Sequence, residues 1–260
     1  MKLSVVVFRG VNRLSWRQIV LLLLIASAAW GWTVDNSLGM ASMEGTAGSN
    51  FEGFIIMWLF MMTAMMLPSA APFISLYSGM VSSNRLPRLF LFGAGYMLIW
   101  GFSGFPAFGL ALGVDEIVQE KSSFGTVLAC VVFVFCGIYQ LTAIKYRCLD
   151  RCRSPLSQIY QAASFKGFLR DFRAGAHNGI FCLSCCWALM ILMIAFGFMN
   201  LWAMIGLAII VAIEKHWVRG EMFGKFVGVL ALGSAIAVIW IPEIAPGLMG
   251  NHGMMEMTKP

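Results

Sequence analysis

The stretch MWLFMMTAMMLP, residues 57–68, decides the class of fold, because it is apolar throughout and carries no charged side chain. It lies within a longer apolar run, 52–76, and a helix needs about 20 residues to cross a bilayer, so this run is long enough. In lipid every backbone polar group needs a partner within the protein, so spanning segments are helices or closed barrels. Long apolar runs, rather than ten-residue alternating strands, therefore predict transmembrane helices.

Composition extends this conclusion to the whole chain. The 260 residues are 60% hydrophobic and only 12% charged, which is roughly half the charge of a soluble domain. We predict a single all-α integral membrane domain, residues 1–260, forming a polytopic helix bundle with the lipid bilayer around it. No basic, aromatic-interleaved surface suggests nucleic acid as a partner. The chain contains about seven expected spans, at 16–34, 52–76, 88–112, 124–145, 178–199, 201–217 and 222–241.

The distribution of basic residues tests this division, because cytoplasmic loops are rich in Lys and Arg. With the N-terminus inside, all of the 18 Lys and Arg except Lys121 and Lys259 fall on the cytoplasmic side. This predicts a bacterial inner-membrane protein with a periplasmic C-terminus and a large cytoplasmic loop at 146–177. The basic start and first apolar stretch could mimic a cleaved signal peptide. The run continues through Trp30 and Trp32, which favours an uncleaved anchor.

Five of the seven cysteines form two groups near the predicted cytoplasmic face. Cys148 and Cys152 stand four residues apart in KYRCLDRCRSP, just past the fourth span. Cys182, Cys185 and Cys186 follow the spacing i, i+3, i+4 in FCLSCCWALM, at the predicted start of the fifth span. That spacing directs three sulfur atoms to one face of a helix.

Clustered thiols in the reducing cytosol indicate a metal site more than a disulfide framework. Thiolates select soft or borderline ions, so Cu(I) is the expected metal and zinc the alternative. His177, shortly before the second group, could join the ligands. Cys130 and Cys136 are each alone in an apolar helix, where cysteine usually serves as a small apolar filler.

Methionine is the second signal of copper. Met57, Met61 and Met65 recur every four residues in the second span, so their thioethers share one helix face. Such a row could pass Cu(I) between soft ligands, although a methionine-rich helix face is also a common packing surface. Pro68 and Pro72 are expected to bend or break this helix near its inner end. Such breaks recur where transport proteins bind substrates.

The C-terminal tail, LMGNHGMMEMTKP, repeats the soft-ligand pattern on the predicted periplasmic side. Thioethers remain competent ligands in oxidising surroundings where thiols would be lost. The tail is therefore a candidate copper-binding arm, and a disordered end is the alternative. Its candidate ligands are His252, Met254, Met255 and Met257.

No catalytic signature can be picked out: the chain has no recognisable Ser/His/Asp set, P-loop, HExxH motif or paired catalytic carboxylates. Only three histidines occur, which argues against a multi-histidine catalytic centre. We therefore predict a protein that is not an enzyme. Glu214 and Lys215, at the inner end of the sixth span, are expected to form a helix-end ion pair.

These motifs carry a resemblance. The chain resembles an uncharacterised bacterial family of predicted metal-binding integral membrane proteins. The resemblance rests on the segment from Met57 to Pro72, on KYRCLDRCRSP at 145–155, on GIFCLSCCWALM at 179–190, and on the downstream Trp202, Met204 and Glu214–Lys215. The resemblance covers residues 50–217 and implies a metal-linked membrane protein with no defined reaction. Separately, the Met57–Met61 spacing is similar to the MxxxM step of trimeric copper importers.

Three functions remain open from the sequence. The leading one is a copper-handling protein that binds and translocates Cu(I), with outer methionines collecting the metal and inner cysteines receiving it, in exchange with a periplasmic copper protein. The second is an accessory subunit or assembly factor of a membrane metalloenzyme, bound to other membrane-protein subunits. The third is a thiol redox relay with quinone.

Overall fold

The computed structural model describes residues 13–40, 51–81, 85–120, 122–154, 160–162, 164–197 and 200–248. Every regular element among these residues is helical, which confirms the all-α prediction. The main helices are α2 (Arg13–Met40), α3 (Phe51–Met80), α4 (Arg85–Glu120), α5 (Ser122–Leu141), α6 (Ala143–Arg153), α8 (Arg170–Phe196), α9 (Leu201–His216) and α10 (Gly220–Trp240), followed by the short turns η2 (Pro242–Ile244) and η3 (Pro246–Leu248).

Five segments of the described chain are long and apolar enough to cross a membrane: Phe51–Ala71, Leu86–Val114, Phe124–Leu141, Arg170–Phe196 and Gly220–Trp240. The other two predicted spans correspond to α2 and α9. The apolar part of α2 is shorter, Val20–Asp35, and α9 has 16 residues. At 1.5 Å per residue, α9 is about 24 Å long, less than the hydrocarbon thickness of about 30 Å. The total of seven spans and the orientation of the termini stay predictions.

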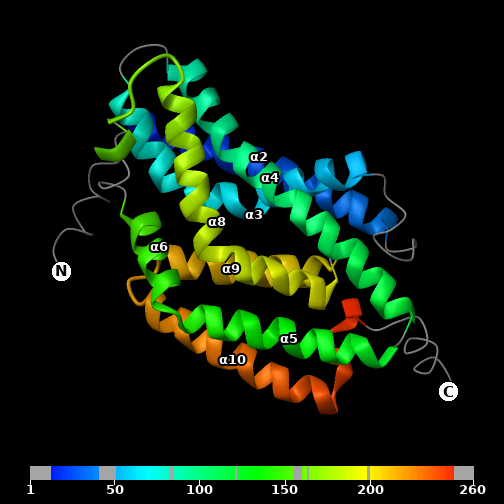
Figure 1. The fold of residues 1–260 in the computed structure, drawn as a ribbon. Coiled ribbons are helices and arrows are strands. Elements are labelled where there is room, and N and C mark those ends of the chain that lie inside the picture. Colours follow the sequence, from blue (N-terminus) through cyan, green and yellow to red (C-terminus); the bar gives the residue numbers. More distant parts are fainter. Residues whose placement is uncertain are drawn as a thin grey trace.

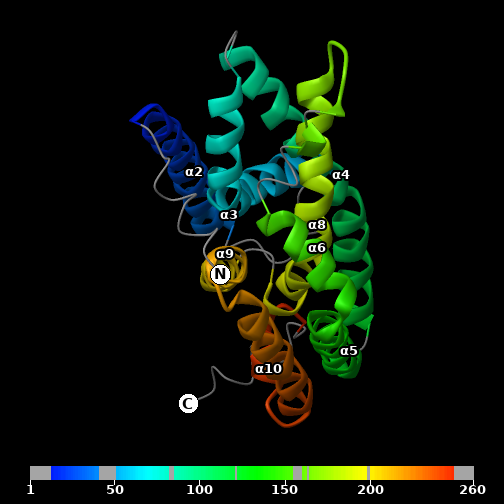
Figure 2. The same cartoon turned by 90° about the vertical axis from the view of Figure 1, so that its left-hand side faces the viewer.

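The helices pack in three main pairs, α2 with α3, α4 with α8, and α5 with α10. Figure 1 shows α5 and α10 side by side, with α9 between this pair and the remaining helices. The view in Figure 2 looks along α9, and the part of α8 labelled there stands upright to the right of it. Because α9 contacts α3, α6, α8 and α10, residues at its C-terminal end can reach several helices at once.

The α4–α8 pair depends on a close backbone approach. A Cβ atom on Gly175 of α8 would lie 1.9 Å from the carbonyl oxygen of Phe92 in α4, and one on Gly95 of α4 would lie 2.1 Å from that of Phe172. Only glycine fits at such distances. Small residues let membrane helices come into van der Waals contact, which is the main attraction between them in lipid.

A buried carboxylate joins three helices at one end of this pair. Asp171 of α8 accepts two hydrogen bonds from Arg88 of α4, Nε to Oδ2 at 3.0 Å and Nη2 to Oδ1 at 2.9 Å. The hydroxyl of Tyr77 in α3 also donates to Oδ1. Burial, together with the hydrogen bond to Asp171, raises the pKa of Tyr77 to about 12, so Tyr77 stays a neutral donor. This paired contact fixes α8 relative to α3 and α4.

The helix is bent or broken at Pro68 and Pro72 in the prediction, and the break is wrong, because α3 continues across both prolines to Met80. Proline lacks an N–H, so Pro68 leaves the carbonyl oxygen of Ala64, four residues earlier, without its helical donor. The indole N–H of Trp30 in α2 donates to that oxygen at 3.1 Å. The freed carbonyl therefore serves α2–α3 packing.

Part of the predicted loop 146–177 is helical. The fourth predicted span, 124–145, divides at Thr142 into α5 and the short polar helix α6, and Thr142 accepts a hydrogen bond from the backbone N–H of Lys145 as the N-cap of α6. At the other end, α8 begins at Arg170, eight residues before the predicted span. Charge marks the limits of an apolar run, but a helix continues through charged residues.

Candidate metal centre

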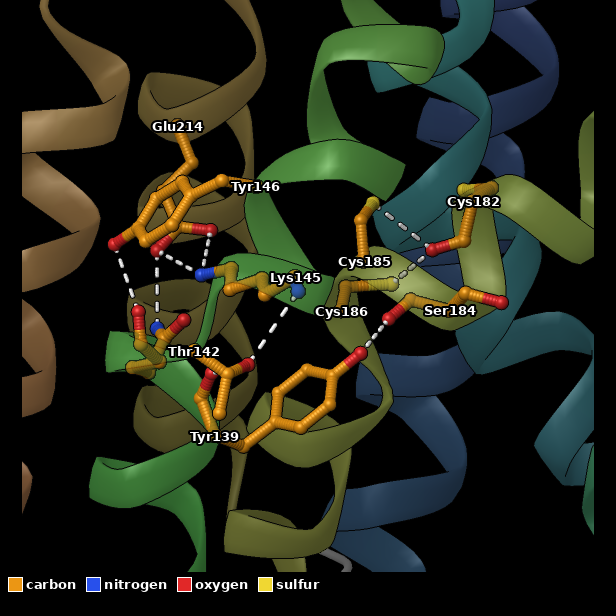
Figure 3. Close-up of polar contacts among 10 residues, drawn as sticks. Tyr139, Thr142, Lys145, Tyr146, Cys182, Ser184, Cys185, Cys186 and Glu214 are labelled. Carbon is orange, nitrogen blue, oxygen red and sulfur yellow. Dashed lines mark hydrogen bonds and ion pairs between the residues drawn. The ribbon is translucent and has the colours of Figure 1, made fainter.

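The three clustered cysteines of α8 are buried in the protein interior. Cys182, Cys185 and Cys186 are 2%, 2% and 1% exposed. The sequence predicts them at the start of a span, but they lie near the middle of α8 because the helix begins earlier. The burial of all three agrees with the predicted shared face. The thiols of Cys185 and Cys186 both donate to the carbonyl oxygen of Cys182, at 3.1 and 2.9 Å (Figure 3).

Helix α6 brings a fourth thiol to this group. Cys152 lies near Cys182 and Cys185, and this proximity, with burial, raises the pKa of the Cys152 thiol well above its usual range. Cys148 lies one turn earlier on α6 and is half-buried. The structure therefore unites the two cysteine motifs, which are separated in sequence by the chain between α6 and α8. All seven cysteines are free thiols.

The thiol of Cys182 makes hydrogen bonds with side chains of two further helices, α9 and α4. The ammonium of Lys215 in α9 donates to its sulfur at 3.0 Å and to the hydroxyl of Ser69 in α3, also at 3.0 Å. The hydroxyl of Tyr96 in α4 shares a hydrogen bond with the same sulfur at 2.9 Å. Lys215 is only 7% exposed. We name the six residues Cys152, Cys182, Cys185, Cys186, Lys215 and Tyr96 the thiol–lysine cluster.

A positive charge beside a buried sulfur favours the thiolate, which is the form that binds metals. The cluster therefore suits a soft cation such as Cu(I). Within the described residues, however, no three His, Cys, Asp or Glu side chains are arranged to hold one metal ion together. Cys185 and Cys186 direct their thiols to a backbone carbonyl instead.

His177 lies among aromatic rings. Its imidazole contacts the rings of Phe165 and Phe181, with centroid distances of 5.9 and 4.8 Å. It is half-buried and one to two turns along α8 from Cys182. A role as a ligand stays a prediction.

The methionines of α3 face the interior. Met57, Met61 and Met65 are 7%, 3% and 2% exposed and belong to the main hydrophobic core. Burial in the core agrees with a packing role and also with a row of shielded thioethers, so copper binding there is untested. The tail ligands His252, Met254, Met255 and Met257 lie outside the described residues.

The predicted ion pair between Glu214 and Lys215 is wrong. Glu214 pairs with Lys145 at the start of α6, with Nζ 2.8 Å from both carboxylate oxygens. The two side chains are 2% and 0% exposed. Gln140 of α5 donates a further hydrogen bond to Glu214 at 3.0 Å, and Figure 3 shows this pair beside the cysteines. Neighbours in a helix diverge by about 100°, so Glu214 and Lys215 reach different partners.

Sequence reasoning missed four members of these polar groups: Lys145, Tyr96, Ser69 and Gln140. Lys145 carried one signal, because it lies at the end of an apolar span, where an ionisable residue is a candidate for a buried pair or a functional site. That signal does not separate Lys145 from the other basic residues expected on the cytoplasmic side. Tyr96, Ser69 and Gln140 carry no such signal, since hydroxyl and amide residues are ordinary in membrane helices.

No curated protein and no solved structure matches the chain. A family model described as "PpoB2: Copper chaperone" matches residues 55–238, a range that includes both cysteine motifs, Lys145, Glu214 and Lys215. This match is more specific than the resemblance drawn from the motifs, because it names copper as the metal. The chain belongs to the PpoB2 copper chaperone family.

Proposed function

We propose that this protein is a copper chaperone embedded in the bacterial inner membrane, which holds Cu(I) on the thiolates of α6 and α8 and passes it to an acceptor. The observation that carries the proposal is the burial of Cys182, Cys185 and Cys186 beside Lys215, with Cys152 of α6 nearby. Two helices contribute soft ligands to a buried point, and a third helix contributes a cation. No reaction is required of such a site, so the proposed role is that of a carrier and not of an enzyme.

Lys215 has a specific purpose in this proposal. Two or three thiolates around one Cu(I) leave the centre with a net negative charge, which is costly in a low-dielectric interior. The ammonium 3.0 Å from Cys182 offsets that charge. A buried lysine without such a partner would itself be costly, so the cation and the thiolates stabilise each other.

Copper binding on this cluster requires a local rearrangement. The thiols of Cys185 and Cys186 are each hydrogen-bonded to the Cys182 carbonyl. Rotation of either side chain breaks its hydrogen bond and frees the sulfur to bind copper. A thiol–carbonyl hydrogen bond is weak compared with a metal–thiolate bond. We expect Cys152 and Cys182 to bind first, since neither thiol donates to a backbone carbonyl within the thiol–lysine cluster, and one of the other two to follow.

The test is the metal content of protein purified in mild detergent under reducing, anaerobic conditions and loaded with Cu(I). We expect stoichiometric copper in the wild type, measured by mass spectrometry, and its loss in a Cys182→Ser, Cys185→Ser, Cys186→Ser triple variant. A Cys130→Ser variant is the matched control, because Cys130 is a half-buried cysteine of α5 outside the cluster. Equal copper in the triple variant and the control would refute the site, and zinc in its place would correct the metal.

We further propose that Cu(I) reaches this cluster along the methionines of α3, after capture by the C-terminal tail. Support comes from the burial of Met57, Met61 and Met65 on one helix. A Met61→Leu, Met65→Leu double variant conserves side-chain volume and should cost less than about 1.5 kcal/mol of stability per site. We expect it to reduce uptake of radiolabelled copper into cells. Unchanged uptake at equal protein levels would remove translocation from the proposal and leave the thiol site intact.

A further inference from the structure

The five cysteines of the two motifs differ in their access to solvent. Cys182, Cys185 and Cys186 are at most 2% exposed, whereas Cys148 and Cys152 on α6 are half-buried. Copper moves between thiols by ligand exchange, in which the incoming sulfur must touch the metal before the outgoing sulfur leaves. A carrier in solution cannot touch the three sulfur atoms of α8 directly. Within this set, α6 therefore carries the two cysteines that are nearest to solvent.

Helix α6 is built to expose this edge. Its buried residues are Lys145, Tyr146 and Leu149, and Lys145 is fixed by the ion pair with Glu214. Cys148 and Cys152 are one turn apart, so they lie on one side of the helix, between its buried and exposed faces. The hydroxyl of Tyr139 at the end of α5 donates to the Ser184 carbonyl of α8, and both cysteines of α6 pack against the core cluster that contains Cys182, Cys185 and Cys186.

The exposed face of α6 is positively charged at the same place. Arg147 and Arg151 are exposed and immediately precede Cys148 and Cys152. The guanidinium of Arg151 lies 5.3 Å from the ring centroid of Phe181, the neighbour of Cys182, which holds this charge over α8. Charged groups beside a binding point attract ligands of opposite charge and accelerate their association.

We propose that the edge of α6 formed by Cys148 and Cys152, the α6 port, is where copper is exchanged with a small anionic thiol that carries Cu(I), with Cys148 as the transient first ligand. This inference rests on the proposed function of the thiol–lysine cluster. A small carrier is favoured because the two cysteines are half-buried, and an anionic one because arginines flank them.

The exchange balances without any change of oxidation state. Two Cu–S bonds to the carrier thiolates break while bonds to Cys148 and then Cys152 form. Each cysteine gives its proton to a departing carrier thiolate, so two carrier thiols are released and copper stays Cu(I). Transfer onward forms the bond from copper to Cys182 and breaks the bond to Cys148, and the proton that the Cys182 thiol gives up moves to Cys148, which is then free for the next ion.

The test compares rates of copper transfer with equilibrium binding. Wild-type protein is mixed in a stopped-flow instrument with the Cu(I) complex of glutathione, an anionic thiol, or of 2-mercaptoethanol, a neutral one. We expect Cys148→Ser to slow transfer about tenfold while copper stoichiometry and affinity stay at the wild-type values. An unchanged rate would refute the port, and an equal loss of affinity would make Cys148 a resident ligand and refute its transient role.

The charge of the carrier is tested separately. We expect an Arg147→Gln, Arg151→Gln double variant to lose the preference for the glutathione complex and its dependence on salt. Arg219→Gln is the control, as an exposed arginine between α9 and α10. If the double variant keeps the preference, the anionic carrier is wrong. If wild-type protein binds no copper from either complex, the proposed function fails first, and the two failures are thereby distinguished.

Discussion

Lys145 and Lys215 are both buried lysines, and both lie close to the C-terminal end of α9, yet their surroundings differ. Lys145 meets the carboxylate of Glu214 with both oxygens at 2.8 Å. Lys215 donates to a thiol and a hydroxyl, and no salt bridge joins it to a carboxylate within the described chain. The first pair has an internal counter-charge and needs no ligand. The second is compensated only when Cys182 is a thiolate, which is the form that binds metals.

The largest effect is expected from Glu214→Gln, which leaves Lys145 buried beside a neutral amide. Removal of one partner of a buried ion pair typically costs about 3–5 kcal/mol. We expect a matching fall in stability, measured by denaturant unfolding in detergent. A Lys145→Met, Glu214→Leu double variant should recover most of the loss, because no buried charge then remains.

The exposed pair Lys225–Glu221, with Nζ and Oε1 2.8 Å apart and both side chains 52% exposed, is the control for that experiment. Glu221→Gln should cost less than about 1 kcal/mol, since solvent screens such pairs. Equal losses in the two single variants would mean that burial does not distinguish the pairs, and the contrast between the lysines would lose its basis.

An intermediate effect is expected from Lys215→Met. Loss of the cation beside Cys182 should lower Cu(I) affinity about 10–100-fold, the usual result of removing a group that supports a metal ligand. Competition with a chromophoric Cu(I) chelator measures this change. The fold should tolerate Lys215→Met better than Glu214→Gln, because the partners left behind are neutral when protonated. Unchanged affinity together with a collapse of stability would assign Lys215 to structure alone.

The smallest effect is expected from Ser69→Ala. Ser69 accepts from Lys215 and donates to the carbonyl of Met66 at 2.8 Å, so its removal should cost about 0.5–1.5 kcal/mol. Copper affinity should stay close to the wild-type value, since the contact of Lys215 with Cys182 remains. A loss of affinity as large as that in Lys215→Met would show that the hydroxyl, and not the thiol, holds the ammonium.

The buried pair of Lys145 and Glu214 also explains the packing of α10 against α9. A Cβ atom on Gly224 would lie 3.0 Å from Oε1 of Glu214 and 3.4 Å from the hydroxyl of Tyr146. Burial, with the charge of Glu214, raises the pKa of Tyr146 to about 12, so its hydroxyl keeps its proton and donates to the carbonyl of Gln140 at 2.7 Å. A side chain at position 224 would displace the carboxylate that compensates Lys145.

Much of the secondary structure was predictable because it depends on the hydropathy of residues that are neighbours in the sequence. Each predicted span corresponds to a helix that begins within a few residues of it, except α8, where charged residues extend the helix by two turns. Hydropathy identifies what is apolar, and in lipid an apolar segment must be helical. The division at Thr142 escapes prediction because a polar cap is too short a signal within a long apolar run.

The site was predictable only in part. The spacing of Cys182, Cys185 and Cys186 is enough to place three thiols on one helix face and to indicate soft-metal chemistry. The predicted pairing of Glu214 with Lys215 fails because adjacency in sequence is not contact, and adjacent helical side chains point in different directions. Lys145 is 69 residues from Glu214, and Lys215 is 33 residues from Cys182.

The sequence by itself thus determined an all-α chain with apolar helices and a cysteine-rich α8, because helix formation and the direction of side chains on one helix depend on neighbouring residues. Only the tertiary structure decided that Cys152 lies near Cys182, that Lys215 donates a hydrogen bond to a thiol and that Lys145 pairs with Glu214. Those contacts depend on where whole helices cross. The crossings are set by close backbone approach at glycines such as Gly175 and by the pairing of buried charges. Both of these causes depend on the packing of the whole chain.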